Sequence, residues 1–436
     1  MNILIISQRW YPDTFGGSEH VAAEQARRLA VLGHKVTIIT ERVRGVLPEI
    51  DKEKVEGKEG GSLVIYRYGS PAQLQRFGGA SRTDLKEVPR LLNVILKEVK
   101  RSESSRATHG GRDSFPPKAD QNDSTLWDAA IVHHPFPAYG FFKSGIEIPT
   151  LYLFHASTAA EAEVEGIRRR LPFFLKPVRP IFNRIFIGWA RRIEAAALHK
   201  ASRIAVLSDF SRKVLQETYP FIGDKIISLP IGIDLESFKP ETAPGQAREK
   251  LGFSSGKPLL LTVRRFTPRM GLTTLIRAME IALKQIPQAQ LLIVGEGPLK
   301  TALQAEIEAR QLRGRVTLVG AVPVEDLPLY YQAADLFVLP TEAFEGLGMA
   351  TLEALASGLP VVGTPAGATP EVLGKLDTKL ITSGTGAEDI ARGILEFFSR
   401  SEEERMSLKK RSREVAEKYY SWSEAVGALE MVLVRL

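Results

Sequence analysis

The feature that most constrains the fold is a strand–turn–helix–strand succession in the second half of the chain. The apolar run Asp335-Leu-Phe-Val-Leu-Pro340 predicts a buried strand. The Gly-containing turn Glu345-Gly-Leu-Gly348 comes next, and the helix-forming residues 349–357 end before Gly358-Leu-Pro360. Pro360-Val-Val362 begins another strand. Strands joined through a helix run parallel, and open α/β sheets bind ligands outside the carboxyl ends of such strands.

The same alternation opens the chain. Asn2 to Ile6 predicts a strand, Phe15-Gly-Gly-Ser18 a turn, and residues 18–32 a helix with Ser18 as its N-cap. Lys35-Val-Thr-Ile-Ile-Thr40 predicts the second strand of this βαβ unit. The alternation restarts near residue 258, and 436 residues are too many for one ordinary core. We therefore expect an α/β protein of two domains.

The turn before residue 349 suits a phosphate that has a sugar on either side. The N–H groups of Leu347, Gly348 and Met349 begin a helix, and they favour an anion together with the helix dipole. Glu353 can accept two hydrogen bonds from the diol of a ribose, and Glu345 can address another part of the same ligand. The alternative is that Glu345 caps the helix and Glu353 is solvated. The surrounding Pro, Gly-x-Gly and Gly-x-Pro pattern favours a ligand site.

With these residues in place, Pro340 to Val362 resembles the signature of the group 1 (GT4-like) family, retaining nucleotide-sugar glycosyltransferases of the GT-B fold. The family pattern is E-x7-E within P-x4-EGFG-x4-EA-x-A-x-G-x-PVV, and Leu347 replaces the usual Phe. The resemblance covers nearly the whole chain apart from about residues 70–125. It implies two Rossmann-like domains whose parallel sheets face each other across a cleft.

The resemblance also implies how the two domains divide the chain. Residues 1–238 would bind the acceptor, and residues 239–419 would bind the nucleotide sugar. A hinge is expected around Lys239 to Gly245, on its Pro, Glu and Gly content. A C-terminal helix at about residues 420–436 would cross back and complete the first domain.

In the first domain, the resemblance assigns Gly16 and Gly17 to a turn that faces the donor phosphate and the acceptor. Two glycines at a helix start also let the backbone approach an anion closely. His155 ends the predicted strand Pro149-Thr-Leu-Tyr-Leu-Phe-His155, where the family carries a His that contacts the donor sugar. His133 and His134 are weaker candidates.

In the second domain, Val263-Arg-Arg-Phe-Thr-Pro-Arg-Met-Gly271 aligns with the family loop G-R-L-x3-K-G, whose Arg and Lys clamp the diphosphate. Arg265 matches the Arg, and a guanidinium can bind phosphate through two hydrogen bonds. Met270 stands where the Lys is expected, and a thioether cannot neutralise an anion. Arg264 or Arg269 could substitute for the missing cation, or the donor is held with one charge fewer.

The nucleotide is expected to lie along Gly295-Glu-Gly-Pro298 and Val319 to Val322, with Glu353 on the ribose. These contacts would be largely to the backbone, so they do not distinguish uridine from guanosine. The donor-binding candidates are Gly16, Gly17, Arg264, Arg265, Gly295, Gly297, Val319, Gly346, Leu347, Gly348, Met349 and Glu353. The catalytic candidates are Glu345, His155 and Arg265. No Asp-x-Asp triplet occurs, so we expect side chains and helix dipoles, and no metal or other cofactor, to neutralise the donor.

The composition limits the classes of partner that we expect for this chain. The formal charge is +7, yet the chain lacks a helix-turn-helix, zinc-finger or RNP-type pattern, so nucleic acid is not expected. There are no cysteines, which excludes disulfides and thiolate chemistry and is compatible with the cytoplasm. No apolar run of 18 residues occurs, and the apolar start of the chain predicts a first strand and not a signal peptide.

The segment Arg168 to Arg192 is unusual because basic residues alternate with large apolar ones and no acidic residue interrupts them. Such a pattern suits the surface of an anionic membrane. The alternative is a helix pair that packs its aromatic residues into the core. Three prolines in the segment argue against one long amphipathic helix. Peripheral attachment to the inner face of the membrane would fit a lipid-linked acceptor.

The function that the sequence predicts is transfer of a hexosyl group from a UDP- or GDP-sugar to a saccharide or lipid-linked hydroxyl, with retention. Cell-surface polysaccharide, lipopolysaccharide or glycolipid synthesis is the expected setting. One alternative is a catalytically silent relative that acts as a binding subunit, which Met270 motivates. A phosphorolytic or hydrolysing enzyme on the same fold is another, although no clear lysine for a pyridoxal Schiff base is present.

Overall fold

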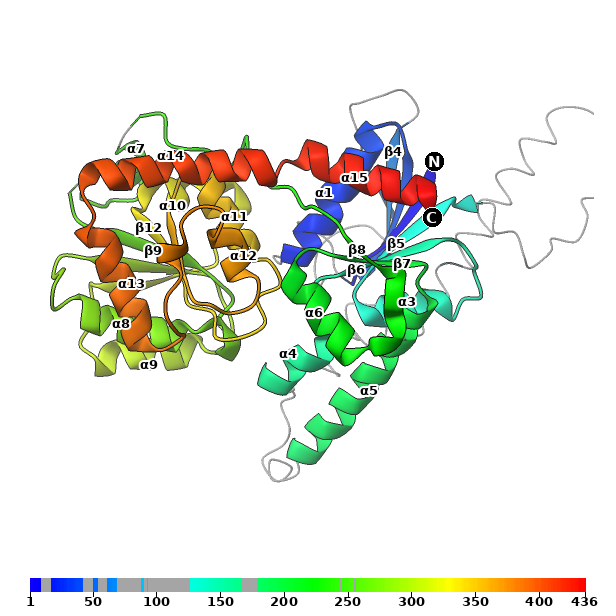
Figure 1. The fold of residues 1–436 in the computed structure, drawn as a ribbon, viewed down its shortest axis with the longest axis horizontal. Helices are drawn as coiled ribbons and strands as arrows, with labels where there is room; N and C mark the ends of the chain where they lie inside the picture. Colours follow the sequence, from blue (N-terminus) through cyan, green and yellow to red (C-terminus); the bar gives the residue numbers. More distant parts are fainter. Residues whose placement is uncertain are drawn as a thin grey trace, which may run out of the picture. The chain divides into compact units, whose positions relative to one another are not determined.

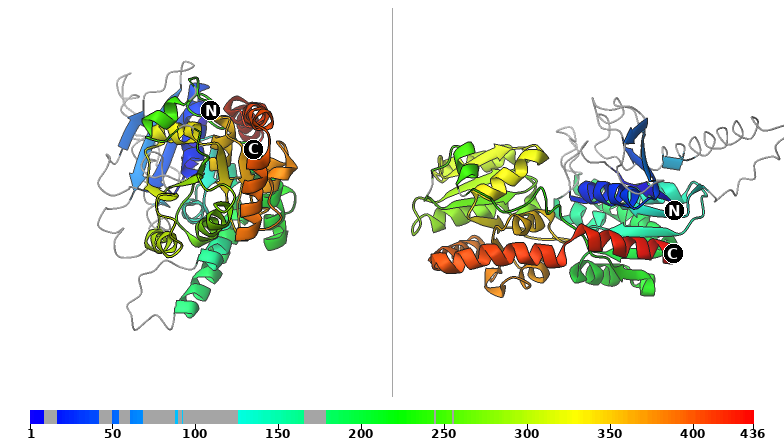
Figure 2. Two further views of the ribbon diagram at one scale, coloured as in Figure 1. Left: turned by 90° about the vertical axis from the view of Figure 1, so that its left-hand side faces the viewer. Right: turned by 90° about the horizontal axis from the view of Figure 1, so that it is seen from above.

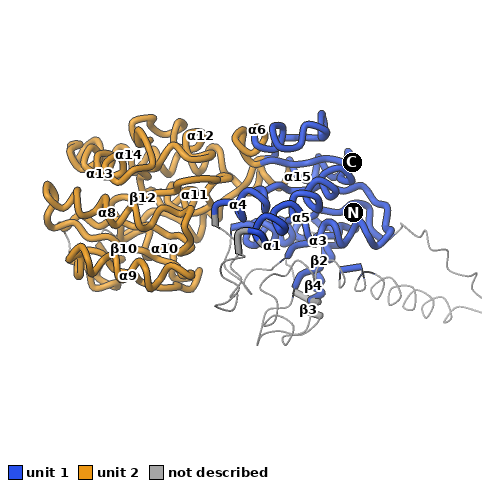
Figure 3. The backbone as a smooth tube through the Cα atoms, turned by 90° about the horizontal axis from the view of Figure 1, so that it is seen from below, with its two compact units in different colours: residues 1–206, 214–229, 428–436 blue, residues 207–213, 230–427 orange. Residues whose placement is uncertain are grey.

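The chain forms two compact units. The computed structural model describes residues 1–8, 17–41, 50–53, 61–68, 88–89, 92, 126–165, 179–243, 245–254 and 256–436. The first unit comprises Met1–Val206, Val214–Leu229 and Ala428–Leu436, and the second comprises Leu207–Lys213 and Pro230–Gly427 (Figure 3). The domain boundaries expected from the sequence remain predictions. Gly16 and residues 166–178 lie outside the described residues.

The first unit is built on an eight-stranded sheet in the order β3-β4-β2-β1-β5-β6-β7-β8. All neighbouring strands are parallel except β3, which runs antiparallel to β4. The strands are β1 (Asn2–Ile6), β2 (Lys35–Glu41), β3 (Ile50–Glu53), β4 (Ser62–Tyr68), β5 (Ala129–His133), β6 (Thr150–Phe154), β7 (Arg203–Val206) and β8 (Ile226–Ser228). The central strand β1 is apolar after Asn2 because parallel sheets are covered on both faces, and Ile3 to Ile6 are fully buried.

The helices described in the first unit are α1 (Gly17–Val31), α3 (Pro135–Phe142), α4 (Thr158–Glu165), α5 (Arg179–Lys200) and α6 (Asp209–Thr218), followed by the 3-10 segment η4 (Pro220–Lys225). The predicted N-cap Ser18 is the second residue of α1, so it does not cap this helix. The first residues of α6 belong to the second unit. Helix α1 turns its small residues, such as Ala22 and Ala26, toward the sheet, where both are fully buried.

The second unit is built on a five-stranded parallel sheet in the order β11-β10-β9-β12-β13. Its strands are β9 (Leu259–Val263), β10 (Gln290–Val294), β11 (Val316–Gly320), β12 (Leu336–Leu339) and β13 (Val361–Gly363). Its helices are α7 (Gln246–Lys250), α8 (Leu272–Ala282), α9 (Lys300–Ala309), α10 (Leu327–Ala333), α11 (Met349–Ala356), α12 (Thr369–Leu373), α13 (Ala387–Ser399), α14 (Glu402–Tyr419) and α15 (Trp422–Arg435), with 3-10 segments η5 (Pro268–Met270), η6 (Val324–Asp326) and η7 (Thr378–Leu380).

Helices cover both faces of this second sheet (Figures 1 and 2). Helix α8 packs against α13 on one face, and α11 packs against α14 on the other. Helix α14 begins at a capping box in which Ser401 and Glu404 satisfy each other's backbone N–H groups. The last residues of α15 belong to the first unit, where Glu430 bonds Nε2 of His34 at 2.9 Å. Across the described ranges, no helix has both the length and the apolar composition needed to cross a bilayer.

Candidate functional site

The loops at the carboxyl ends of the strands interlock in the second unit. The N–H of Arg264, after β9, donates to the carbonyl of Val294 in β10 at 2.9 Å. The N–H of Gly295 donates to the carbonyl of Gly320 at the end of β11 at 2.8 Å. A Cβ on Gly295 would lie 1.9 Å from the carbonyl oxygen of Arg264, so only glycine fits there. The predicted donor loops after β9, β10 and β11 are therefore brought together by backbone contacts.

Glu345 lies at the centre of this region as part of a buried polar network. Its side chain forms an ion pair with Nη2 of Arg264 and accepts a hydrogen bond from Oγ1 of Thr341 at 3.0 Å. Nη2 of Arg264 also donates to Oγ1 of Thr341 at 2.6 Å. Arg264 is thus committed to neutralising Glu345, and its buried Nε finds no hydrogen-bond partner among the described residues.

Both bonds of the Glu345 carboxylate go to the loop after β9 and the end of β12, so Glu345 does not cap α11. The N-cap of α11 is Gly348, which has the left-handed φ of 84°. A Cβ at Gly348 would lie 3.1 Å from Oγ1 of Thr351 and 3.5 Å from the carboxylate of Glu345, so the start of α11 packs closely beside that carboxylate. The sequence predicts a phosphate at this helix start.

The backbone at Glu345 is held in a strained turn. Phe344, before it, has a φ of 54°, which is unfavourable for a residue with a Cβ. The carbonyl of Glu345 accepts the N–H of Ala368 at 2.8 Å. Gly367 packs so closely that a Cβ there would lie 2.2 Å from that same carbonyl oxygen. The carbonyl of the next residue, Gly346, accepts a hydrogen bond from Ser208 at 2.6 Å.

Glu353 is not a simple solvated helix residue. It is half-buried on α11, and its Oε2 accepts a hydrogen bond from the hydroxyl of Tyr331 at 2.6 Å. The Tyr331 ring is fixed between Phe238, edge-on, and Phe337, stacked, each with centroids 5.7 Å away. Burial raises the pKa of the Glu353 carboxyl, while the Tyr331 hydrogen bond and the charge of Arg264 oppose that rise.

Tyr331 is a residue that the sequence interpretation missed. Its position could have marked it as a candidate, because residue 331 lies in the predicted helix directly before the signature strand. Its partner, however, is 22 residues away and could not be identified from the sequence alone.

The contacts of the loop after β9 show which of its arginines is available to a ligand. Arg269 is buried and donates to the carbonyl of Phe344 at 3.0 Å, so it supports the turn before Glu345. Met270 is 5% exposed and packs into the core. Arg265 is exposed and has no ion pair with any described residue. Arg265 is therefore the arginine of this loop that is open to an anion.

A pocket of about 370 Å³ adjoins the predicted nucleotide segment in the second unit. Val319, Ala321, Val322 and Pro323 form one wall, and Tyr330 belongs to α10. Asp326 and Leu329 also line it, so the pocket combines polar and apolar groups.

The predicted histidine lies in a buried cluster of the first unit. Nδ1 of His133 lies 2.9 Å from Nε2 of His155, and their rings stack with centroids 5.2 Å apart. His134, with a φ of 69°, stacks on His155 at 5.7 Å. Burial lowers the pKa of His133 to about 3, and burial lowers the pKa of His155 well below its usual value. Both rings are therefore neutral at ordinary pH.

The other predicted residue of the first unit that is described is Gly17, which is exposed at the start of α1. Among the described residues, no three His, Asp or Glu side chains converge to hold a metal ion.

Comparisons with known proteins identify relatives of the second unit and of the fold. Residues 245–415 match the family model "Glycosyl transferases group 1". The chain is 30% identical over 176 residues to the GDP-mannose-dependent alpha-(1-6)-phosphatidylinositol monomannoside mannosyltransferase of Mycobacterium tuberculosis, a match that covers 39% of this chain and 46% of that protein. It is 28% identical over 204 residues to the alpha-monoglucosyldiacylglycerol synthase of Streptococcus pneumoniae, covering 46% and 45%. The chain thus spans about half the length of the curated relatives it matches.

Solved structures are similar over the full length. A sucrose-phosphate synthase of Thermosynechococcus elongatus has a TM-score of 0.72 and 20% identity, covering 100% of this chain and 98% of that one. Anabaena HepE in complex with UDP has a TM-score of 0.68 and 16% identity, with both chains covered completely. At such identities the likeness concerns the fold.

Proposed function

Because residues 245–415 belong to the group 1 glycosyltransferases and the chain has the GT-B fold, we propose that it transfers a hexosyl group from a nucleotide-diphosphate sugar to a hydroxyl acceptor. The observation that carries the proposal is the buried Glu345–Thr341–Arg264 network beside the N-terminus of α11, whose N-cap Gly348 makes no side-chain capping bond. It places a fixed carboxylate next to a helix start that attracts phosphate.

The donor would be held by groups of the second unit. The backbone N–H groups at Gly346, Leu347, Gly348 and Met349, with Arg265, would take the diphosphate. The carboxylate of Glu353 would take the ribose diol, oriented by the hydroxyl of Tyr331. Relatives are described as GDP-mannose-dependent, and a structural neighbour binds UDP, so both bases remain candidates.

We propose retention at the anomeric carbon, without a metal ion. The leaving diphosphate would depart from the face that the acceptor hydroxyl attacks, as Arg265 and the α11 N-terminus stabilise its charge. Glu345 and neutral His155 would support the positive charge that develops on the sugar. Arg264 keeps the Glu345 carboxylate in one position, so little reorganisation is needed when that charge appears.

The acceptor is proposed to be a saccharide or a lipid-linked hydroxyl in polysaccharide, lipopolysaccharide or glycolipid synthesis, acting in the cytoplasm. Two relatives, a phosphatidylinositol monomannoside mannosyltransferase and an alpha-monoglucosyldiacylglycerol synthase, support lipid-linked acceptors.

A thermal-shift panel of UDP-, GDP- and ADP-sugars, with and without EDTA, tests the donor. A ligand at about one hundred times its dissociation constant should add roughly 2.7 kcal/mol of stability. We expect a shift for one base that EDTA does not change, and its loss in Glu353→Ala. Absence of a shift with all three bases would contradict the donor assignment.

Product analysis by NMR tests the stereochemistry. An α-linked donor sugar should give an α-linked product if the configuration is retained. A β-linked product would contradict retention while leaving glycosyl transfer intact.

A catalytically silent protein is the second candidate, and one observation favours it. Met270 is buried where the family pattern has a lysine, and Arg264 and Arg269 are committed to other partners, which leaves Arg265 as the loop's available cation. A silent protein would show the thermal shift with its donor but neither transfer nor donor hydrolysis.

A further inference from the structure

The first unit buries a carboxylate that the proposed reaction does not use. Glu194 of α5 is fully buried, although a glutamate is almost never fully buried without partners. Its Oε2 accepts hydrogen bonds from the hydroxyls of Ser157 at 2.8 Å and Tyr219 at 2.6 Å. Its Oε1 accepts the backbone N–H of Thr158 at 3.2 Å. These three donors are neutral, so hydrogen bonds hold the carboxylate in the interior without a cation.

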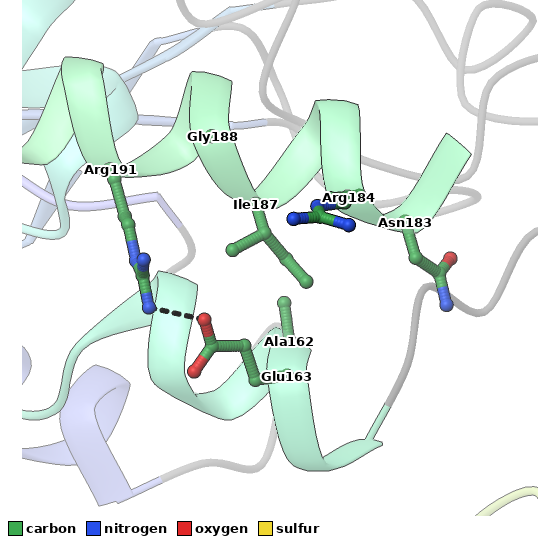
Figure 4. A pocket seen from close by; sticks show the side chains of 7 residues that line it. All are labelled: Ala162, Glu163, Asn183, Arg184, Ile187, Gly188 and Arg191. Carbon is green, nitrogen blue, oxygen red and sulfur yellow. Dashed lines mark hydrogen bonds and ion pairs between the residues drawn. The ribbon is translucent and has the colours of Figure 1, made fainter. Parts of the chain in front are cut away.

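The charges around Glu194 show why it depends on these donors. Burial raises the pKa of the Glu194 carboxyl, the three hydrogen bonds oppose that rise, and the charge of Glu161 on α4 adds to it. The other carboxylate that α4 turns toward α5, Glu163, is exposed and pairs with Arg191 (Figure 4). Glu194 is therefore stabilised by hydroxyls and by the start of α4, where the helix dipole also favours a negative charge.

The donors from α4 end the short loop that carries His155. Residues 155–157 connect the last residue of β6 to the first residue of α4. Oγ of Ser157 accepts the N–H of Ala160 at 3.3 Å, and its carbonyl accepts the N–H of Glu161 at 2.9 Å. Ser157 thus caps α4, and the same hydroxyl donates its proton to Glu194. The last residue of the loop is therefore fixed to both α4 and α5.

The first residue of the loop is fixed through its ring. Nε2 of His155 lies 2.9 Å from Nδ1 of His133 on β5, and the two rings stack. Strand β5 is the parallel neighbour of β6, so this contact joins the ends of two adjacent strands. Ala156 is the one residue between the two fixed positions.

Helix α5 is itself held on the first unit, which gives Glu194 a fixed place. Phe186 and Trp189 of α5 pack on buried Phe136 of α3, with ring centroids 6.4 Å and 5.3 Å away. For these two aromatic residues the observed packing is the alternative to membrane contact that the sequence offered.

We infer that Glu194 is a positioning residue for His155, because its bonds to Ser157 and Thr158 fix the loop that carries the ring. With the ring held by His133 and the loop held by Glu194, little reorganisation is needed when positive charge develops on the sugar. The inference rests on the proposed role of His155 in glycosyl transfer.

Glu194→Gln tests this role with a side chain of the same shape. A carboxamide places an NH2 group where one carboxylate oxygen accepted, so it cannot accept from all three donors in their present positions. We expect kcat for transfer to fall about tenfold, within the range of coupling between residues in contact. The donor KM should change less than about twofold, because an interaction made in the transition state lowers kcat without weakening ground-state binding.

A double-mutant cycle separates positioning from a purely structural role. In His155→Ala the ring is absent, so adding Glu194→Gln should lower kcat by less than about twofold. An equal loss of kcat with and without the ring would overturn the inference. Ser157→Ala repeats the cycle with the carboxylate in place, since Glu194 keeps its bonds to Tyr219 and Thr158, and it should lower kcat about three- to tenfold.

The matched control makes the same chemical change at the surface of the same pair of helices. Glu163→Gln removes the exposed ion pair with Arg191 and should leave both kcat and KM unchanged (Figure 4). Thermal melts of each variant check that the fold is intact.

Histidine NMR tests the contact without relying on activity. The ring signals of His155 are assigned by their loss in His155→Ala. Glu194→Gln and Ser157→Ala should both shift these signals, and Glu163→Gln should not. Unchanged signals in the first two variants would overturn the inference, even in a chain that transfers sugar. Shifted signals in a chain without transfer or donor hydrolysis would instead contradict the proposed function and retain the positioning contact.

Discussion

Each unit buries a polar cluster at the carboxyl ends of its strands. The two clusters offset the desolvation of their polar groups in different ways. In the second unit, Glu345 is charged and is matched by Arg264, with Thr341 bonded to both. In the first unit, His133 and His155 contact each other, and burial keeps both rings neutral. One cluster therefore depends on an opposite charge, and the other depends on both imidazole rings staying neutral.

The largest effect is expected from breaking the charge match. Arg264→Ala leaves Glu345 buried without its cation, which costs about 3–5 kcal/mol in comparable pairs. We expect a clear fall in the melting temperature of the second unit, measured by calorimetry, together with loss of donor binding.

An exposed ion pair supplies the control for this change. Arg313→Ala removes the partner of Glu308 at the surface and should lower stability far less than Arg264→Ala, because an exposed pair is solvated and screened by salt. If Arg264→Ala were as mild as Arg313→Ala, the buried pair would not organise the site.

The next largest effect is expected on folding stability when the pH is lowered. In the unfolded chain His133 has a pKa near 6.5, whereas in the folded chain its pKa is about 3. The unfolded state therefore binds the proton first, so stability decreases as the pH falls from about 6.5 toward 3. His133 alone should cost about 2 kcal/mol at pH 5 relative to pH 8.

Urea unfolding at pH 8 and pH 5 measures this dependence. His133→Gln should be less stable at pH 8 but should show a smaller loss between the two pH values. His199→Gln, at an exposed position, is the control and should keep the original pH dependence. An unchanged slope in His133→Gln would mean that His133 is not the group that titrates.

The smallest effect is expected from removing the hydroxyl that orients Glu353 while the carboxylate of Glu353 stays in place. Tyr331→Phe removes the hydrogen bond to Glu353 and keeps the ring between its aromatic neighbours. We expect donor affinity to fall about three- to tenfold, with little change in kcat. Because that hydrogen bond lowers the pKa of Glu353, its loss should also shift the acid limb of donor binding to higher pH.

Calorimetric titration with the donor between pH 5 and pH 8 measures both changes. Tyr419→Phe removes a hydroxyl from an exposed tyrosine of α14 and should alter neither. A loss of donor affinity in Tyr331→Phe without a shift in its pH dependence would assign Tyr331 a packing role only. Unchanged donor binding in Glu353→Gln would contradict the ribose site itself.

The fold could be predicted from the sequence where the spacing of apolar residues along a strand or helix was regular. The parallel βαβ units, the positions of Glu345 and Glu353 around α11 and the glycines of the turn all follow from local pattern. The antiparallel edge strand β3 did not follow, because a short polar strand has no distinctive pattern.

The site was less predictable because its partners are distant in sequence. Arg264 and Glu345 are 81 residues apart, and the sequence offered Arg264 as a diphosphate ligand before its commitment to Glu345 was visible. The burial of Met270 and Arg269 was likewise invisible, because side-chain exposure depends on the turn that η5 makes. The roles of all these residues remain predictions.

Gly367 has a consequence for how mutational data on this chain would be interpreted. Its φ of 62° and its contact with the Glu345 backbone leave no room for any side chain. In a saturation mutagenesis screen, every substitution at this position should therefore be depleted as strongly as substitutions of a reacting group. A ranking by mutational tolerance would then assign Gly367 to the active site, although it offers no side chain to a ligand.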